Sequence, residues 1–229
     1  MQSYLTPGQV TIVEEHADNQ RDRLLIRVLF HVGCRVSEAL AIEVGHVDFT
    51  GRTITIPHLK SRLRLSCPNC RYSLARRHTF CPGCGTKIGD TVAEEEKRRR
   101  IRTLPVDDET LTLLREYINR GGPVSKNGKI LIFSINRHRA WQIVKECAER
   151  AGLPKLVNPE TGKVHNISPH RFRDALAVEA IKTDDSGNGL RLLQEHLGHQ
   201  SINTTMKYRK IASEEHRDWY DKLWQRDTS

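Results

Sequence analysis

Four cysteines set the tightest limit on how part of this chain can fold. They form two Cys-Pro-x-Cys pairs, Cys67 with Cys70 and Cys81 with Cys84, and ten residues separate the pairs. Four thiolates at this spacing are typical of a closed tetrahedral zinc site, which leaves no ligand position for a catalytic water. Because the first residues lack the pattern of a secretory signal, we expect the cytoplasm and metal binding rather than disulfides. The alternatives are two metal-free thiol pairs or a redox pair.

The paired cysteines lie in a long connection between two strand-like segments. Residues 52–56 alternate polar and apolar side chains, and strand character returns at residues 100–106. About 40 residues separate them, whereas a hairpin connection usually takes about 2–5. The connection has few large apolar side chains, so a bound metal would have to supply its folding energy. We therefore predict a zinc-ribbon module at residues 61–98, inserted into a β-hairpin of a larger domain.

The rest of the chain is predicted to be mainly helical. Residues 6–9 have the residue types of a helix start, and residues 21–32 repeat apolar side chains at helical spacing. Beyond Pro105 the chain is expected to be helical to its end, apart from loops or turns. The other expected helices cover residues 37–42, 107–118, 136–151, 168–181, 190–197, a segment after Ser201 and 213–224. A loop or small turn is expected at 157–167 and a turn at 184–189. With a small antiparallel sheet, the predicted class is α+β, mainly α-helical.

Charge bears on the partner more than on the fold. The 229 residues carry a formal charge of +9 at pH 7. A basic surface favours polyanions, because neutralising phosphates releases their counterions. No apolar run reaches the length of about 18 residues that a membrane helix needs, so no membrane segment is expected. Charge alone does not separate nucleic acid from other polyanions.

Three separated motifs carry candidate chemistry. They are Val-Gly-Cys-Arg-Val-Ser-Glu at residues 32–38, Ser-Pro-His-Arg-Phe-Arg-Asp at 168–174, and His-Leu-Gly-His at 196–199 followed by Tyr208. Each also has an ordinary structural explanation. The arginine of the first motif can pair with Glu38, the second motif can form a surface His–Arg pair, the last histidine can be a cation at a helix C-terminus, and Tyr208 can be a half-buried core residue.

Together the motifs fit phosphoryl transfer from a DNA phosphodiester to a protein hydroxyl. In this reaction negative charge spreads over the non-bridging oxygens, which the planar guanidinium groups of Arg35 and Arg173 could bind. His170 lies near the start of a predicted helix, where the helix dipole would favour the neutral imidazole, so it is a candidate base for Tyr208. His199 could donate a hydrogen bond to the scissile phosphate. The leaving 5′-oxygen needs an acid, which a lysine could supply.

The order of these motifs resembles that of the tyrosine recombinases, which include phage integrases and Xer-type resolvases. The first-motif arginine, the His-x-x-Arg pair, Leu-Gly-His and a tyrosine nine residues later all recur, and Tyr-Leu-Thr-Pro at residues 4–7 resembles the start of the family's catalytic domain. The resemblance covers residues 1–60 and 100–210. It implies a tyrosine recombinase catalytic domain over residues 1–229 and a site-specific DNA recombinase or integrase. Tyr208 would form a 3′-phosphotyrosyl intermediate before strand exchange and religation.

The resemblance also implies a partner, a proton donor and the absence of a cofactor for the chemistry. Double-stranded DNA is the expected substrate, with a homo-tetramer on DNA, a monomer as the alternative free form, and a place at the nucleoid. The family's lysine lies on the β-hairpin; Lys60 matches it by position, and Lys97 is the alternative. The family's N-terminal core-binding domain, which closes around DNA, is expected to be absent here.

Several alternatives stay open. Tyr220 is a rival nucleophile at a different spacing from the Leu-Gly-His motif, and Trp219 and Trp224 could dock on a neighbouring subunit or pack within the chain. The protein could also be a non-catalytic DNA-binding relative, or relax DNA as type IB topoisomerases do. The inserted module carries basic residues that could contact the DNA backbone or form a solvated face. These residues are Arg62, Arg64, Arg71, Arg76, Arg77 and His78.

Overall fold

The computed structural model describes residues 2–57, 62–75, 78–88, 92–96, 101–158 and 161–209. The chain divides into two compact units. The larger unit comprises Met1–Ile56 and Arg102–Ser229, and the cysteine unit comprises Pro57–Ile101. Within the described residues, no helix has both the length and the apolar character needed to cross a membrane.

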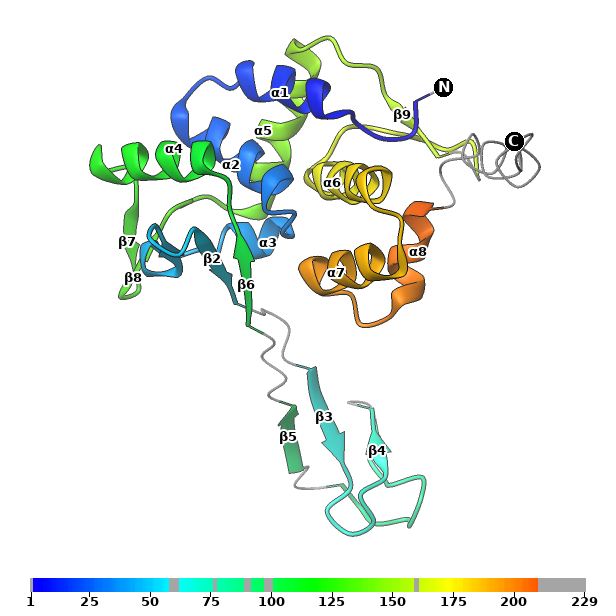
Figure 1. The fold of residues 1–229 in the computed structure, drawn as a ribbon. Coiled ribbons are helices and arrows are strands. Elements are labelled where there is room, and N and C mark those ends of the chain that lie inside the picture. The colour runs from blue at the N-terminus through cyan, green and yellow to red at the C-terminus, as the bar shows by residue number, and fades with distance from the viewer. Residues whose placement is uncertain are drawn as a thin grey trace, which may run out of the picture. The chain divides into compact units, whose positions relative to one another are not determined.

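Helices packed around a hydrophobic core build most of the larger unit (Figure 1). The helices are α1 (Pro7–Glu15), α2 (Gln20–His31), α3 (Val36–Ala39), α4 (Asp108–Asn119), α5 (Arg137–Arg150), α6 (Pro169–Thr183), α7 (Gly187–Leu197) and α8 (Ile202–Arg209), with a 3₁₀ turn at Val44–His46. α2 is central and packs against α1, α4 and α6. Its residues Leu24, Leu25, Ile26, Val28 and Leu29 are completely buried, as the helical spacing predicted.

Side-chain caps explain where these helices begin. Thr6 and Gln9 form a reciprocal capping box at the start of α1, which confirms the predicted helix start. Asn19, Asp107 and Asn136 each accept a hydrogen bond from a first-turn backbone N–H of α2, α4 and α5. These caps satisfy backbone donors that have no partner inside the helix.

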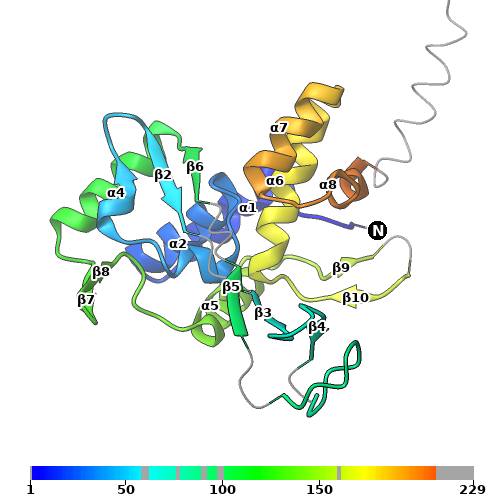
Figure 2. The same ribbon diagram turned by 90° about the horizontal axis from the view of Figure 1, so that it is seen from below.

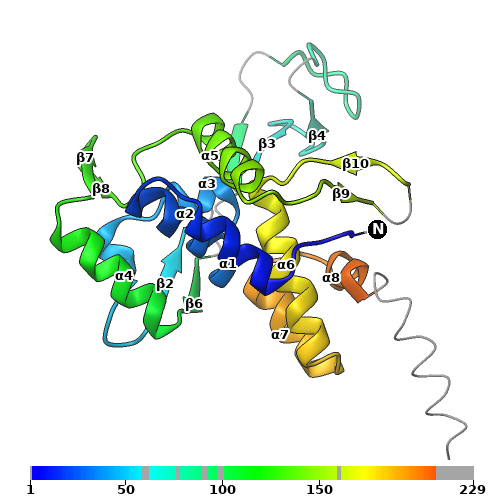
Figure 3. The same ribbon diagram turned by 90° about the horizontal axis from the view of Figure 1, so that it is seen from above.

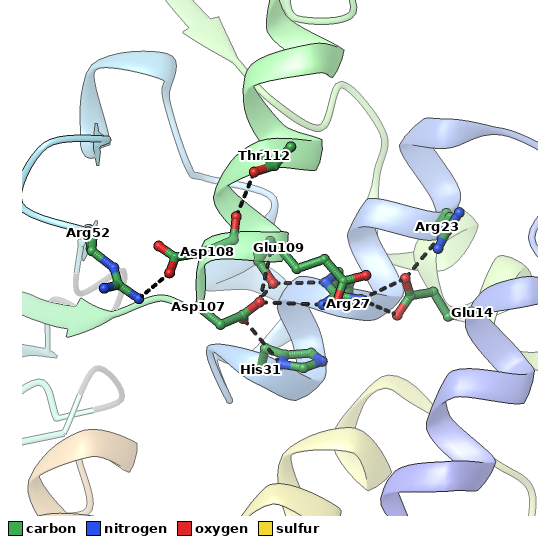
Figure 4. A network of polar contacts seen from close by, with 10 residues as sticks. Glu14, Arg23, Arg27, His31, Arg52, Asp107, Asp108, Glu109 and Thr112 are labelled. Atoms are coloured by element: carbon green, nitrogen blue, oxygen red, sulfur yellow. Dashed lines mark hydrogen bonds and ion pairs between the residues drawn. The ribbon is translucent and has the colours of Figure 1, made fainter.

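A buried arginine ties three of the helices together (Figure 4). Arg27 of α2 has a side chain that is only 8% exposed. Its guanidinium lies 3.1 Å from Glu14 of α1 and 2.6 Å from Glu109 of α4, and it donates to the Thr110 hydroxyl at 2.9 Å. A buried charge is costly unless it is paired, so this network favours one docking arrangement of α1, α2 and α4.

A small antiparallel sheet lies beside the helices of the larger unit. Its strands are β1 (Val47–Asp48), β2 (Thr53–Ile56) and β6 (Arg102–Pro105), in the order β1-β2-β6. Ile56 pairs with Arg102 at the point where the chain leaves β2 and later returns in β6. The helices and this sheet confirm the expected α+β, mainly helical class.

Two hairpins and one helix start differ from the sequence-based expectation. Strands β7 (Val124–Lys126) and β8 (Lys129–Leu131) pair around Asn127 and Gly128, which have φ values of 51° and 75°. The Asn-Gly pair is a strong hairpin signal, and the expectation of helix to the end of the chain was wrong here. A second short hairpin joins β9 (Leu156–Val157) to β10 (Val164–His165), where a loop or small turn was expected from residue 157. α7 begins at Gly187, inside the expected turn, because Ser186 caps it.

The last three described helices form one group (Figures 2 and 3). α6, α7 and α8 share a second apolar cluster, separate from the main core, and Tyr208 packs against its edge. The cluster is made of Ala177, Ile181, Leu190, Leu193 and Leu197. This packing sets the position of α8, the helix that carries the candidate nucleophile. The helix predicted at residues 213–224 lies outside the described residues.

The cysteine unit contains a small antiparallel sheet of its own. Strands β3 (Arg62–Ser66), β4 (Ser73–Leu74) and β5 (Val92–Glu96) have the order β4-β3-β5. Its apolar cluster consists of Cys67, Leu74 and Cys81, with Leu65 and Ile88 packed against them. Among the described residues of this unit, so few apolar side chains gather that burial of these alone cannot stabilise a folded unit.

Candidate functional site

The three sequence motifs meet in the larger unit. The first motif turns from α2 into α3, the second opens α6, and the third runs from the end of α7 into α8. Two backbone carbonyls, of Gly33 and Leu197, accept hydrogen bonds from the guanidinium of Arg173. One side chain of the second motif thus joins the first motif to the third.

Arg173 is the most deeply buried of the catalytic candidates that the structure describes, at 1% exposure. Burial lowers the pKa of its guanidinium to about 10, and the nearby positive charge of Arg35 contributes to this shift. The group therefore remains charged at neutral pH. Gly33, which accepts one of its bonds, has φ +61°, and a Cβ there would collide with Leu176. The glycine of the first motif is thus required by the backbone and by the close packing of α6.

Glu38 holds Arg35 in place. Its carboxylate accepts from the backbone N–H and the guanidinium of Arg35, each at 2.9 Å, and from the guanidinium of Arg102 at 2.7 Å. Burial alone would raise the pKa of Glu38, but the Arg35 N–H and the two arginine charges outweigh burial and lower it. The ion pair between Arg35 and Glu38, considered above as a purely structural role for Arg35, does exist. It orients Arg35 while leaving 38% of the arginine side chain exposed.

Arg102 is a member of the site that the motifs did not indicate. It is the first residue of β6, and besides Glu38 it donates to the carbonyl of His196 near the end of α7. A Cβ on Gly198 would come within 2.9 Å of the Arg102 side chain, so the two residues are closely packed. The Arg-Thr-Leu-Pro strand was predicted, but nothing in its alternation marked its first residue as a link between two motifs.

His199 lies buried just after α7. It follows Gly198, whose left-handed backbone ends the helix, and its Nδ1 is 3.0 Å from the Thr205 hydroxyl of α8. Burial, followed by the charges of Arg173 and Arg35, lowers the pKa of His199 to about 4. The imidazole is therefore neutral at pH 7, which argues against the explanation of His199 as a cation at the helix C-terminus.

Tyr208 lies beside His199 and bonds to an acidic residue of α6. The two aromatic rings are stacked with centroids 6.3 Å apart. The Tyr208 hydroxyl donates to Asp174 Oδ1 at 2.9 Å. Burial, and then the negative charge of Asp174, raise the pKa of Tyr208 above its usual range. Tyr208 is half-buried, as expected for a tyrosine at the edge of the core. Its hydroxyl nevertheless bonds to a charged side chain, Asp174.

His170, the candidate base, lies one helical turn before Asp174. Its side chain is 63% exposed, and its Nε2 is 3.5 Å from the same Oδ1 atom that binds Tyr208. Asp174 was not among the predicted site residues, although its spacing of four residues from His170 places the two on one helix face. The structure thus puts a carboxylate next to both the candidate base and the candidate nucleophile.

Several predicted residues lie outside the described part of the chain. They include both candidate lysines, the rival tyrosine, the C-terminal tryptophans and two arginines of the inserted module. These residues are Lys60, Lys97, Tyr220, Trp219, Trp224, Arg76 and Arg77.

The four paired cysteines converge in the cysteine unit. Their Sγ atoms all lie within 4.8 Å of one another, with 3.6 Å between Cys67 and Cys84 and 3.5 Å between Cys70 and Cys81. Four sulfurs around one zinc at a bond length of about 2.3 Å lie about 3.8 Å apart. The Gly83 backbone N–H also points at Cys81 Sγ, at 3.3 Å. The cluster could therefore hold a metal with four thiolate ligands.

Comparison with protein families and curated proteins gives one consistent result. A family model described as "Phage integrase family" matches residues 5–215. "Tyrosine recombinase XerC" of Herpetosiphon aurantiacus is 30% identical over 216 residues, covering 91% of this chain and 53% of that protein. "Tyrosine recombinase XerD" of Corynebacterium glutamicum is 26% identical over 198 residues, covering 86% of this chain and 51% of that protein. The chain thus spans about half the length of these relatives.

Solved structures show the same fold. The crystal structure of XerA recombinase matches with a TM-score of 0.65 at 18% identity, over 99% of this chain and 65% of that chain. The pre-cleavage complex of the XerH site-specific recombinase with its difH substrate matches with a TM-score of 0.62 at 19% identity, over 98% of this chain and 55% of that chain. The larger unit therefore has the helical architecture of these recombinase structures.

Proposed function

Since this chain belongs to the phage integrase family, we propose that it is a site-specific DNA recombinase whose nucleophile is Tyr208. The observation that carries the proposal is the convergence of three distant motifs on one site. Arg173 bonds the first motif to the third, and the Tyr208 ring stacks on the neutral His199. Binding DNA would not by itself require a tyrosine held at this place.

The proposed step exchanges one phosphate ester for another. The Tyr208 oxygen attacks the scissile phosphorus, a tyrosine O–P bond forms, and the bond from phosphorus to the 5′-oxygen breaks. The phenol proton passes to His170, and the leaving 5′-oxygen takes a proton from a lysine, Lys60 or Lys97. No cofactor enters this exchange. The freed 5′-hydroxyl of a partner strand then attacks the phosphotyrosine, which completes strand exchange and releases the tyrosine.

The arginines stabilise the charge of the transition state. Arg35, with its exposed side chain, donates to the non-bridging oxygens after Glu38 has fixed its orientation. A guanidinium has five N–H donors, and Arg173 uses two of its groups on the carbonyls of Gly33 and Leu197. The buried positive charge of Arg173 adds to the electrostatic field that stabilises negative charge on the scissile phosphate.

His199 supplies a neutral hydrogen-bond donor in this scheme. If the Thr205 hydroxyl donates to Nδ1, the imidazole proton resides on Nε2, which then donates to the phosphate. Because the pKa of His199 is lowered to about 4, the ring does not need to lose a proton before it takes this role at neutral pH.

The partners follow from the reaction. We propose double-stranded DNA as substrate, a homo-tetramer on DNA, and action at the nucleoid in the cytoplasm. The larger unit is the catalytic domain in this proposal, and the cysteine unit is an insertion between β2 and β6. We further infer that its four cysteines bind one structural zinc ion. The sulfur distances fit tetrahedral thiolate ligation, and the small apolar cluster leaves most of the stability to the metal.

A trapping experiment tests the function. The full chain is incubated without magnesium with a pool of randomised duplex DNA that carries nicks, so that a short leaving fragment diffuses away and the covalent adduct persists. We expect an adduct that survives denaturation with the native chain and with Tyr220→Phe, and none with Tyr208→Phe. If Tyr208→Phe still forms the adduct, the assignment of Tyr208 as the nucleophile is wrong. If no chain forms an adduct while all of them retard DNA in a gel, the protein is a DNA-binding relative without this activity.

A further inference from the structure

The hydroxyl of Tyr208 contacts a carboxylate rather than an arginine. We propose that Asp174 is a positioning residue, which holds this hydroxyl in a resting contact that a bound phosphodiester must displace before attack. This inference rests on the proposed function, because it assigns a role to the partner of the proposed nucleophile. The direct observation is the hydrogen bond from Tyr208 to Asp174 Oδ1 at 2.9 Å.

The resting contact is built on a fixed carboxylate. The Asp174 side chain is only 14% exposed, and its second oxygen lies 3.1 Å from the Arg171 guanidinium. Both partners are mounted on packed elements, because α6 and α8 share the apolar cluster at which the Tyr208 ring is half-buried. The packing of α6 against α8 therefore brings the Tyr208 hydroxyl to Asp174.

The contact competes with the proton transfer that the reaction needs. His170 Nε2 is 3.5 Å from the same carboxylate oxygen that accepts the Tyr208 hydroxyl. The Tyr208 hydroxyl has one proton, so while it donates a hydrogen bond to Asp174 it cannot also donate to His170. An incoming phosphodiester brings negative charge that attracts the Arg171 guanidinium and repels the Asp174 carboxylate. Binding of DNA therefore weakens the resting contact from both sides.

Asp174 is a poor candidate for the base itself. An ordinary carboxylic acid is about six pKa units more acidic than a phenol, so proton transfer to it is strongly uphill. The charge of Asp174 also raises the pKa of Tyr208, after burial, which opposes formation of the phenolate. The charges of Arg173 and Arg171 act in the opposite direction but do not reverse the shift. These observations favour a role for Asp174 in restraining the Tyr208 hydroxyl over a role in removing its proton.

The contact can be tested without any DNA cleavage. Tyrosine in the full chain is labelled with ¹³C at Cζ, and Tyr208→Phe identifies the Tyr208 signal. We expect Asp174→Asn and Asp174→Ala to shift this signal and to start its ionisation at lower pH than in the native chain. Glu179→Gln removes an acidic group from the same helix, and it should leave the signal unchanged. A Tyr208 signal and titration that are the same in the native chain and both Asp174 variants would overturn the proposal.

The trapping assay then tests the consequence for the reaction. With the native chain forming an adduct, Asp174→Asn should form it about tenfold faster in single turnover, since one hydrogen bond to a charged group no longer restrains the nucleophile. A slower reaction of both variants, with folding intact by circular dichroism, would make Asp174 an activating group and overturn the restraint. If the native chain forms no adduct on any DNA, the proposed function fails, while the titration still decides the Asp174 contact.

Discussion

Replacing Glu38 by glutamine should destabilise the larger unit more than its conservative shape suggests. The carboxylate is buried and accepts from the Arg35 N–H and from two guanidinium groups, while a third, on Arg173, lies near enough for its pKa to respond to Glu38. Glutamine keeps one acceptor oxygen but turns an NH₂ group toward two positive charges. Breaking a buried ion pair by removing one partner costs about 3–5 kcal/mol. Because Arg35 remains partly exposed and is solvated in the variant, we expect about 3 kcal/mol.

Urea unfolding followed by far-UV circular dichroism measures the effect. The matched control is Asp108→Asn, which removes the exposed ion pair with Arg52 seen in Figure 4 and should change the unfolding free energy little. The pKa of Glu38 is lowered in the folded chain, so its contribution is fully present above the ordinary value of 4.5 and is lost as pH falls through the folded value. The gap between native chain and Glu38→Gln should therefore be widest near neutral pH and narrow in acid.

Two results would refute this reasoning. A loss below about 1 kcal/mol at pH 7 would mean that the arginines are solvated well enough without the carboxylate. A gap that stays constant down to acid pH would mean that the cost comes from altered packing and not from the charge. The trapping assay on the same variant should also show slower adduct formation, because Arg35 loses its anchor.

Three further changes have expected outcomes. Cys67→Ser should lower the bound zinc, measured by elemental analysis, well below one ion per chain and unfold the cysteine unit, whereas an unaltered metal content would refute the proposed site. Gly33→Ala should lower the unfolding free energy by about 1–3 kcal/mol, measured by urea unfolding, because an L-residue is strained at φ +61° and its Cβ collides with Leu176. Thr205→Val should slow adduct formation about tenfold without weakening DNA binding in a gel shift, since the His199 tautomer is no longer set; equal rates would remove Thr205 from the mechanism.

Most of the secondary structure could be predicted because the signals are local. Apolar spacing placed α2, residue types suited to capping placed the start of α1, and the expected starts of α4 and α5 lie within one residue of the observed ones. The two missed hairpins are short, and one of them carried an Asn-Gly signal that the expectation of continuous helix overrode. Local rules work where the partners of a hydrogen bond are close in sequence.

The partners within the site depend on packing instead. Asp174 and Tyr208 are 34 residues apart, Arg102 is 64 residues from Glu38, and Arg173 is 140 residues from Gly33. No periodicity links such pairs, because the distance between them is set by how helices and strands dock. Residue types and their order pointed to Arg35, Arg173, His199 and Tyr208 as candidates. Only the tertiary structure placed Arg102 between two motifs and Asp174 on the tyrosine hydroxyl.

The sequence by itself determined the class of fold, the family and the candidate residues. These depend on spacings along the chain: four cysteines in two pairs, helical repeats, and motifs in a set order. The tertiary structure decided which charges are paired and that the Tyr208 hydroxyl bonds to Asp174. Burial and the close approach of like charges change a pKa, and both arise only after distant segments pack together.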